Sequence, residues 1–163
     1  MAIFTHNELY LSRMPHLASN KQAKFQYHLL EKMEAGINLT GPEVKSAKRG
    51  EISLKGSYIT LRPTGAWLIH TYIAPYKPAK LSQTDYDPYR DRRLLLRREE
   101  ISRLVGLSQS RGLTIVPISF YTKGGFVKVE LAVARGKRLV DKRRSIKERE
   151  IKVKINRALR AKP

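Results

Sequence analysis

The sequence predicts a mainly β domain, a small barrel with short helices on its flanks, followed by a basic C-terminal tail. Three observations support this fold class. Short segments with strand periodicity recur between turn signals, two of them form a clear hairpin late in the chain, and the end of the chain changes to dense positive charge. A chain of 163 residues has the size of one domain with a tail.

The N-terminal part predicts a leader, a helix and a strand. Residues 1–19 show no clear periodicity, and we expect a mobile leader there. Asn20 has a side chain suited to cap a short helix. Apolar residues then alternate from Leu29 to Leu39, which predicts a strand whose period only Glu31 interrupts. Gly36 indicates a bulge or a close approach of another backbone.

Thr40 and Glu43 have the spacing of a capping box. In this motif the threonine hydroxyl accepts a hydrogen bond from the glutamate N–H, and the carboxylate accepts one from the threonine N–H. The spacing predicts a short helix that runs to Arg49, with Gly50 beyond its end.

The central part predicts a hairpin, a loop and a helix. Strand patterns over 58–62 and 66–73 flank a Pro-Thr-Gly turn. Three prolines and no periodicity over 74–89 predict an exposed loop. A helix is expected over 97–105, closing at Gly106, and the three leucines at 94–96 are either its first turn or a separate short strand.

The clearest local pattern is a hairpin over 115–134. Two strands, at 115–122 and 126–134, flank the turn Lys123-Gly124-Gly125. Valine and leucine occupy the odd positions from 127 to 133, and Lys128 and Glu130 lie between them. This alternation predicts that one face of the strand is buried.

The charge divides the chain into the leader (1–19), a folded body (20–134) and a tail (135–163). The whole chain has 33 basic and 14 acidic residues and a formal net charge of +19. The tail alone holds 13 basic residues against 3 acidic ones. Because so much positive charge repels itself, a polyanion is the expected partner, and the charge indicates either nucleic acid or an anionic membrane surface.

The sequence offers no catalytic or metal-binding constellation. The absence of cysteine excludes disulfides, zinc knuckles and thiol nucleophiles, and no glycine opens a Walker-type phosphate loop. The four histidines lack paired metal spacing. Asp85, Asp87 and Asp91 are better explained as turn residues than as magnesium ligands, and Glu99 and Glu100 point to different sides of a helix. We therefore expect no metal, no cofactor and no enzymatic activity.

Membrane features are missing as well. No apolar run approaches the roughly 20 residues of a membrane-spanning helix. No apolar block of a signal peptide follows the first basic residue, Arg13. We expect a cytoplasmic protein without a membrane partner.

Six arginines within a short segment suggest how a polyanion is bound. Their guanidinium groups suit phosphate oxygens, which favours a phosphate-facing surface over a solvated helix face. Exposed aromatic side chains near such charge can stack on unpaired RNA bases. The six are Arg90, Arg92, Arg93, Arg97, Arg98 and Arg103.

The tail has the pattern of an amphipathic helix. Ile151, Ile155 and Leu159 recur every four residues among charged neighbours. So narrow a stripe cannot overcome the cost of helix nucleation and the repulsion of like charges. We expect the tail to fold on an anionic partner. A membrane surface is a second interpretation, weakened because the stripe lacks Trp and Phe.

Eight short motifs follow one another along the chain: NKQAKFQYHLLEKMEAG (20–36), TGPEVKS (40–46), SY (57–58), IAPY (73–76), DPYRDRRLLL (87–96), EISRLVG (100–106), ARGK (134–137) and DKR (141–143). In order and spacing, these motifs resemble the SsrA-binding proteins of bacteria, the small protein B family. The resemblance implies an oligonucleotide-binding-type barrel that binds the tRNA-like domain of transfer-messenger RNA (tmRNA) and enters stalled ribosomes. It also implies that the tail occupies the decoding region and mRNA channel of the small subunit.

Residue by residue, the resemblance assigns two sets of binding residues. The set that faces tmRNA is Asn20, Lys21, Lys24, Glu34, Gly36, Lys45, Ser46, Arg90, Arg92, Arg93 and Leu95. The set that serves the ribosome is Gly136, Lys137, Asp141, Lys142, Arg143, Lys147 and Arg149. The sequence departs from the family at Lys24, where arginine is usual, and at Pro42 and Ala47.

Three functions compete at this stage. The ordered motifs favour a monomeric trans-translation factor with tmRNA and small-subunit rRNA as partners. Composition and tail alone equally suit a general ribosomal protein or RNA chaperone, and an RNA-processing enzyme is the weakest alternative. Glu34 is unusual on an RNA-facing surface: it accepts hydrogen bonds from RNA, orients a neighbouring lysine, or is a solvated strand residue.

Overall fold

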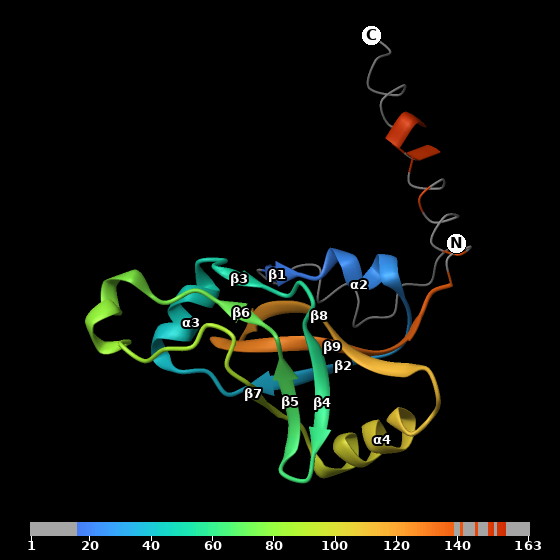
Figure 1. Ribbon diagram of the computed structural model, residues 1–163, viewed down its shortest axis with the longest axis horizontal. Coiled ribbons are helices and arrows are strands. Elements are labelled where there is room, and N and C mark those ends of the chain that lie inside the picture. The colour runs from blue at the N-terminus through green and yellow to red at the C-terminus, as the bar shows by residue number, and fades with distance from the viewer. Residues whose placement is uncertain (1–15, 139–140, 142–145, 147–149, 152, 156–163) are drawn as a thin grey trace.

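The computed structural model describes residues 16–138, 141, 146, 150, 151 and 153–155, with the backbone alone at 80–82. Its centre is a sheet that closes on itself (Figure 1). The strand order is β1-β8-β4-β5-β7-β2-β9, and β9 also pairs with β8. The strands from β8 to β9 therefore form a closed ring, and β1 lies outside it on β8.

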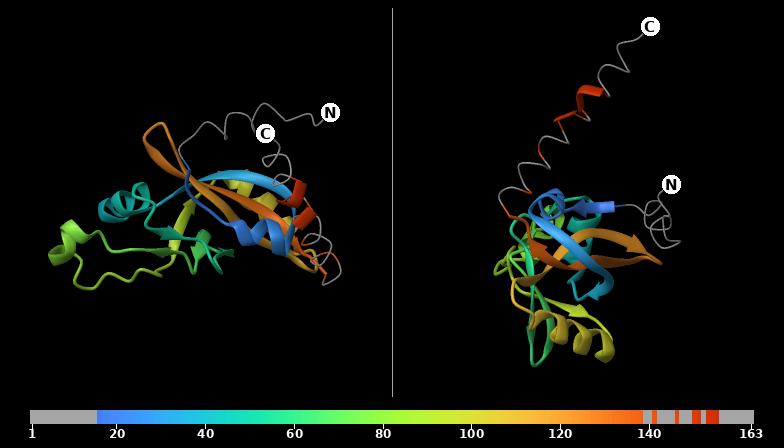
Figure 2. Two further views of the ribbon diagram at one scale, coloured as in Figure 1. Left: turned by 90° about the horizontal axis from the view of Figure 1, so that it is seen from above. Right: turned by 90° about the vertical axis from the view of Figure 1, so that its right-hand side faces the viewer.

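All strand pairings are antiparallel. The strands are β1 (His16–Ser19), β2 (Tyr27–Ile37), β3 (Ile52–Ser53), β4 (Tyr58–Arg62), β5 (Gly65–Ile69), β6 (Tyr72–Ile73), β7 (Arg92–Leu95), β8 (Leu113–Lys123) and β9 (Phe126–Gly136). The helices are α2 (Lys21–Gln26), α3 (Gly41–Lys48), the 3-10 helix η1 (Lys77–Ser82) and α4 (Arg98–Ser108). The helices lie outside the ring, so the expected barrel with flanking helices is confirmed (Figures 1 and 2).

The core lies inside the ring. Val129, Leu131 and Val133 of β9 are buried there with Leu68 of β5 and Phe120 of β8. These odd-numbered residues of β9 are those that the alternation predicts to face inward. Burial of their apolar surface drives closure of the barrel, because each such side chain gains about 1.5–3 kcal/mol on leaving water.

The predicted β8–β9 hairpin is confirmed. Lys123 pairs with Phe126, and the two residues between them, Gly124 and Gly125, have φ angles of 57° and 82°. Two consecutive residues in this left-handed region form the turn that matches the twist of a two-residue hairpin, and glycine adopts it without strain.

The interrupted alternation in β2 corresponds to an irregularity in the ladder. The register of β2 against β9 shifts between Leu29 and Glu31, so an extra residue there moves Leu30 outward, where it is 57% exposed. Gly36 permits the close approach that its position indicated. A Cβ atom there would lie 3.1 Å from the Cβ of Leu95 on β7.

Both predicted helix caps are present. The Asn20 carboxamide oxygen accepts a hydrogen bond of 3.0 Å from the Ala23 N–H at the start of α2. Thr40 and Glu43 form the reciprocal capping box of α3. The turn after α3 uses Gly50, whose φ of 77° lies in the left-handed region.

The hairpin expected at 58–73 is shorter than predicted. β4 and β5 pair from Tyr58↔Ile69 to Arg62↔Gly65, but the chain leaves the sheet at His70, whose φ is 56°. The next strand, β6, pairs with β3 in a separate two-stranded sheet. The left-handed residue turns the chain away from β4, and alternation alone gives no sign of such a turn.

In the second half of the body two further predictions are corrected, and the open question of the leucines at 94–96 is decided in favour of a strand. Helix α4 continues through Gly106 because Leu107, in its last turn, packs against the core. The leucines at 94–96 belong to a strand, β7, as far as Leu95. The segment 74–89 includes η1 and is tied down by Tyr86, whose hydroxyl donates to the Ile73 carbonyl at 3.0 Å.

The predicted leader is too long at its C-terminal end. His16–Ser19 form β1, which pairs with β8 through His16↔Tyr121 and Ser19↔Ser119. So short a strand has no periodicity to detect, and it forms because the edge of β8 offers unpaired backbone groups. The rest of the leader lies outside the described residues.

In the tail, the described positions 141, 146, 150, 151 and 153–155 have helical backbone. Folding of the tail on a partner stays a prediction.

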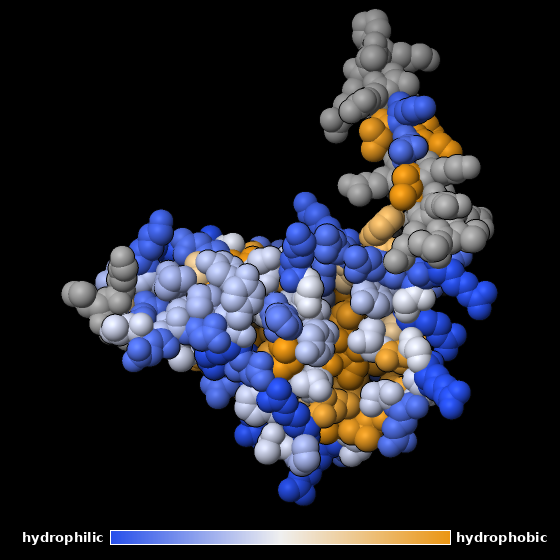
Figure 3. All heavy atoms as spheres, viewed as in Figure 1, coloured by the Kyte–Doolittle hydropathy of each residue, from blue (hydrophilic) through white to orange (hydrophobic). Residues whose placement is uncertain are grey.

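The surface is largely hydrophilic in the view of Figure 3, and hydrophobic residues gather mainly over the barrel wall beside β4 and α4. Within the described ranges, none of the helices is both long and apolar enough to cross a membrane.

Candidate nucleic-acid interface

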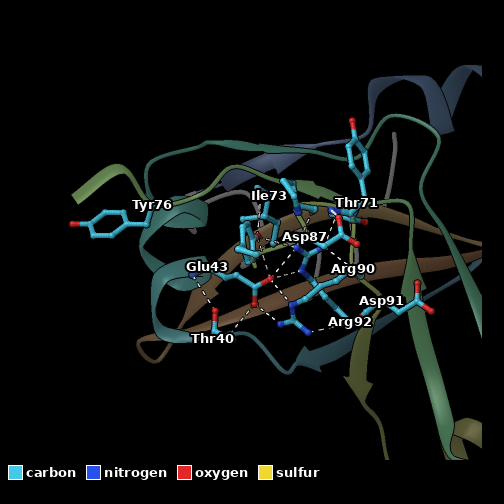
Figure 4. A network of polar contacts seen from close by, with 12 residues as sticks. Thr40, Glu43, Thr71, Ile73, Tyr76, Asp87, Arg90, Asp91 and Arg92 are labelled. Atoms are coloured by element: carbon cyan, nitrogen blue, oxygen red, sulfur yellow. Dashed lines mark hydrogen bonds and ion pairs between the residues drawn. The ribbon is translucent and has the colours of Figure 1, made fainter. Parts of the chain in front are cut away.

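Glu43 of α3 is the centre of a buried polar network (Figure 4). Its carboxylate accepts hydrogen bonds from the Arg90 and Arg92 Nε atoms, each at 2.9 Å, and from the Thr40 N–H at 2.8 Å. Burial alone would raise the pKa of Glu43, but the hydrogen bond from Arg90, the Thr40 N–H and the charge of Arg92 hold it below its ordinary value. Glu43 is therefore ionised and joins α3 to β7.

Arg92 is wrongly placed among the RNA-facing residues. Its side chain is fully buried, and it donates to the carbonyls of Thr71 at 2.7 Å and Pro88 at 3.0 Å and to the Tyr86 hydroxyl at 3.1 Å. All three nitrogens of the Arg92 guanidinium therefore donate hydrogen bonds within the protein. The neighbouring Arg93 points outward and is exposed, because successive side chains of a strand lie on opposite faces.

The arginine cluster does not form one phosphate-facing surface. Besides the buried Arg92, Arg90 pairs with Glu43 and keeps a side chain that is 34% exposed. Arg103 of α4 pairs with Glu31 of β2 at 3.0 Å. Arg93, Arg97 and Arg98 are exposed, on β7 and at the start of α4. The strand and the helix thus divide the six side chains among different environments.

The two RNA-binding residues assigned to α3 lie in different environments, one buried and one exposed. Ser46 is fully buried, and its hydroxyl has no hydrogen-bond partner among the described residues, so its placement on the RNA-facing surface is wrong. Lys45 is exposed, and its ammonium lies 5.3 Å from the centre of the Tyr76 ring. The Arg49 guanidinium lies 4.7 Å from the same ring. Lys45 is accessible to a phosphate, with Tyr76 beside it.

Helix α2 presents two lysines next to the start of the tail. Lys21 and Lys24 are exposed, whereas the Asn20 carboxamide is used within the fold by Ala23 and by the Pro117 carbonyl. The Lys137 N–H donates to the Gln26 carbonyl at 2.9 Å, and its ammonium donates to the Lys24 carbonyl at 3.2 Å. The tail therefore leaves the barrel beside α2.

Asp141, an acid among basic neighbours in the tail, has two contacts within the protein. Its carboxylate accepts a hydrogen bond of 3.3 Å from the Arg138 N–H, as a residue of a helix cap does, and lies 3.6 Å from the His28 ring. Gly136 ends β9 and is exposed. The other assigned tail residues lie outside the described residues; they are Lys142, Arg143, Lys147 and Arg149.

Glu34 on β2 is not a solvated strand residue. Its carboxylate accepts hydrogen bonds from the Tyr121 hydroxyl at 2.5 Å and from the Lys123 ammonium at 3.0 Å, and the Lys128 ammonium lies 3.7 Å away. Burial would raise the pKa of Glu34, but these contacts lower it below its ordinary value. Burial and the bond to Glu34 raise the pKa of Tyr121. The geometry supports the interpretation in which Glu34 orients lysines.

The sequence patterns do not predict the roles of several residues in this interface. Glu43 was recognised as a cap and not as the partner of two arginines, because nothing in a local pattern identifies a partner more than forty positions away. Lys128 carried a signal, since its alternation with valines places it on the face of the hairpin opposite the buried one. Lys123 carried none, because the sequence places it in the turn and the structure makes it the last residue of β8. In the described part of the chain, no group of three or more His, Cys, Asp or Glu residues could hold a metal ion.

Comparison with known proteins decides the family. A model of the SmpB protein family matches residues 17–161 of the chain. The chain belongs to the SmpB family. The SsrA-binding protein of Sulfurihydrogenibium sp. is 47% identical over 146 residues, which are 90% of this chain and 95% of that protein. The SsrA-binding protein of Trichodesmium erythraeum is 44% identical over 144 residues, 88% of this chain and 92% of that protein.

A solved SmpB structure has the same fold. A chain of "tmRNA-SmpB: a journey to the center of the bacterial ribosome" is 41% identical, with a TM-score of 0.62, over 75% of this chain and 85% of that chain. The family inferred from the motifs is thereby confirmed. Among the residues assigned from the SmpB family, the structure leaves exposed Lys21, Lys24, Lys45, Arg93, Leu95 and Gly136.

Proposed function

We propose that this chain binds the tRNA-like domain of tmRNA and brings it to stalled ribosomes, where its tail enters the decoding region and mRNA channel. The observation that carries this function is the likeness to an SmpB chain of a tmRNA-SmpB structure, at 41% identity over three quarters of the chain. The barrel supplies the RNA-binding surface, and the tail contacts small-subunit rRNA.

The charge of the chain supports this function physically. Lys21 and Lys24 on α2 and Lys45 on α3 present ammonium groups to solvent, and Arg93 adds a guanidinium. Each phosphate that such a side chain neutralises releases condensed counterions, which favours binding at low salt. A net charge of +19 also speeds the encounter with RNA by electrostatic steering.

The chain acts, in this proposal, by binding alone. Its buried ionic groups are fully paired, which suits a structural role and not proton transfer: Arg92 donates to Glu43 and to backbone carbonyls, and Glu43 accepts from Arg92, from Arg90 and from the Thr40 N–H. We propose that the protein works as a monomer in the cytoplasm, where tmRNA and ribosomes are.

Selective binding tests the function. The full-length protein is titrated into a labelled tRNA-like domain of tmRNA, and separately into a small-subunit rRNA fragment of the same length. We expect tighter binding to the tRNA-like domain, weakened by Lys21→Ala with Lys24→Ala and unchanged by Arg111→Ala, which removes an exposed charge outside the assigned set. Equal affinity for both RNAs would favour a general RNA chaperone instead.

A further inference from the structure

We propose that the tip of the β8–β9 hairpin is a stacking site for an unpaired nucleotide of the bound RNA. Phe126 supplies the platform for the base, and Lys123 and Lys128 bind the flanking phosphates. The inference rests on the proposed function, because it takes RNA as the partner, and it adds a contact that lies outside the residues assigned from the family.

Phe126 is exposed where the turn does not require an aromatic side chain. It is 72% exposed, although large apolar side chains are usually withdrawn from water. The adjoining Gly124 and Gly125 have no side chains that could cover the ring. The hairpin also projects from the barrel, as the two views of Figure 2 show.

The positive charges lie on the same face as the ring. Phe126 is directly opposite Lys123 in the ladder, and Lys128 is two positions further along β9, opposite Tyr121. Directly opposed residues of an antiparallel pair, and every second residue of a strand, point to one face. The ring and the two ammonium groups therefore share the outer face of the hairpin.

Glu34 holds the two lysines in place from the neighbouring part of the sheet. Its two carboxylate oxygens face the Lys123 and Lys128 ammonium groups at 3.0 and 3.7 Å, and the buried Tyr121 fixes the carboxylate from below. The lysine side chains remain 49% and 30% exposed, so each keeps donors for a ligand. One carboxylate does not neutralise two ammonium groups, and the tip stays positive.

This combination suits an unpaired nucleotide better than a protein surface. A flat ring stacks on any base, because every base has a π face, and cations beside it bind the sugar-phosphate backbone. Glu34 belongs to the residues assigned to tmRNA, so the tip continues the predicted interface and does not form a separate one. At a surface that binds a protein, we would expect acidic or apolar side chains beside the ring. The side chains beside Phe126 are instead those of Lys123 and Lys128.

The test compares variants of the full-length protein in their affinity for a fluorescently labelled tRNA-like domain of tmRNA. We expect Phe126→Ala and Phe126→Leu to weaken binding by about five- to a hundredfold, the range found when a stacked aromatic is removed, and Phe126→Trp to preserve it. Val105→Ala, which trims a residue of α4 that is 38% exposed, is the matched control. The melting temperature of each variant shows that the hairpin is folded.

A salt series separates stacking from charge. Phe126→Ala should leave the slope of log affinity against log salt unchanged, whereas Lys123→Ala should reduce it by about one. Wild-type protein that fails to bind the RNA would contradict the proposed function itself. Wild-type binding together with unchanged binding by Phe126→Ala would overturn only the stacking site. So would a loss confined to ribosome binding with free RNA bound normally, because the tip would then contact the ribosome and not the bound tRNA-like domain.

Discussion

Replacing Glu43 with glutamine removes the charge at the centre of the buried network and keeps the size of the side chain. Arg92 then remains fully buried with its positive charge, and its hydrogen-bond partners are all uncharged. The Thr40 N–H retains an oxygen acceptor, so the cap of α3 is changed little. The variant therefore tests the ion pair and not the helix.

The structure sets the size of the effect. Removing one partner of a buried ion pair costs about 3–5 kcal/mol, because the other charge stays without compensation in a medium of low dielectric constant. The contact with Arg90 adds little, since that side chain is 34% exposed and water replaces the lost partner. A loss of this size lowers the melting temperature by about 6–20 °C in a domain of this length.

Urea and thermal unfolding followed by circular dichroism measure the change. Asp91→Asn is the control, because it breaks an exposed ion pair, Arg62 with Asp91 at 2.7 Å, and should cost no more than about 1 kcal/mol. The folded-state pKa of Glu43 is lowered, so its stabilisation is present above the ordinary value of 4.5 and is lost as the pH falls through the folded-state pKa. Glu43→Gln should remove that part of the acid sensitivity. A variant as stable as Asp91→Asn would refute the reasoning.

Three further predictions concern RNA and the ribosome. A chain that ends at Arg138, which keeps β9 whole, should still bind the tRNA-like RNA, with a salt slope of several units; complete loss of binding or a flat slope would contradict this. Glu34→Ala should weaken RNA binding in a filter assay although it makes the protein more basic, because the hairpin lysines lose their orientation; unchanged or tighter binding would argue against that role. Combined Asp141→Ala, Lys142→Ala and Arg143→Ala should leave tmRNA binding nearly intact and abolish tagging on stalled ribosomes in a reconstituted system, and equal loss of both activities would place the tail within the RNA-binding body.

Local chemistry made much of the fold predictable. The capping box of Thr40 and Glu43 and the cap at Asn20 are visible in sequence because their partners lie three positions away. The alternation over 127–133 is visible because a half-buried strand repeats every second residue. Even the interruption at Glu31 was informative, since it coincides with the shift of register.

Partners far apart in sequence account for the failures. The sequence predicts a surface position for Arg92 because the buried carboxylate that compensates its charge comes from another element. The alternation of β7 would have separated Arg92 from Arg93, had the segment been recognised as a strand. Likewise, the sequence predicts a helix end at Gly106 because the packing of Leu107 on the core has no local signature. The exposed lysines Lys21 and Lys24 were predictable, since charge without a partner stays in water.

Closure of the barrel by β9 has a consequence for synthesis of the chain. β2 emerges from the ribosome early, but the strand that covers its edge is the last one of the body. Until that strand appears, β2 and β8 both present unpaired edges, and contacts between such distant segments form slowly. A nascent chain that stops before β9 would be an open sheet prone to aggregation and proteolysis. Folding should therefore be completed only when translation has almost reached the tail.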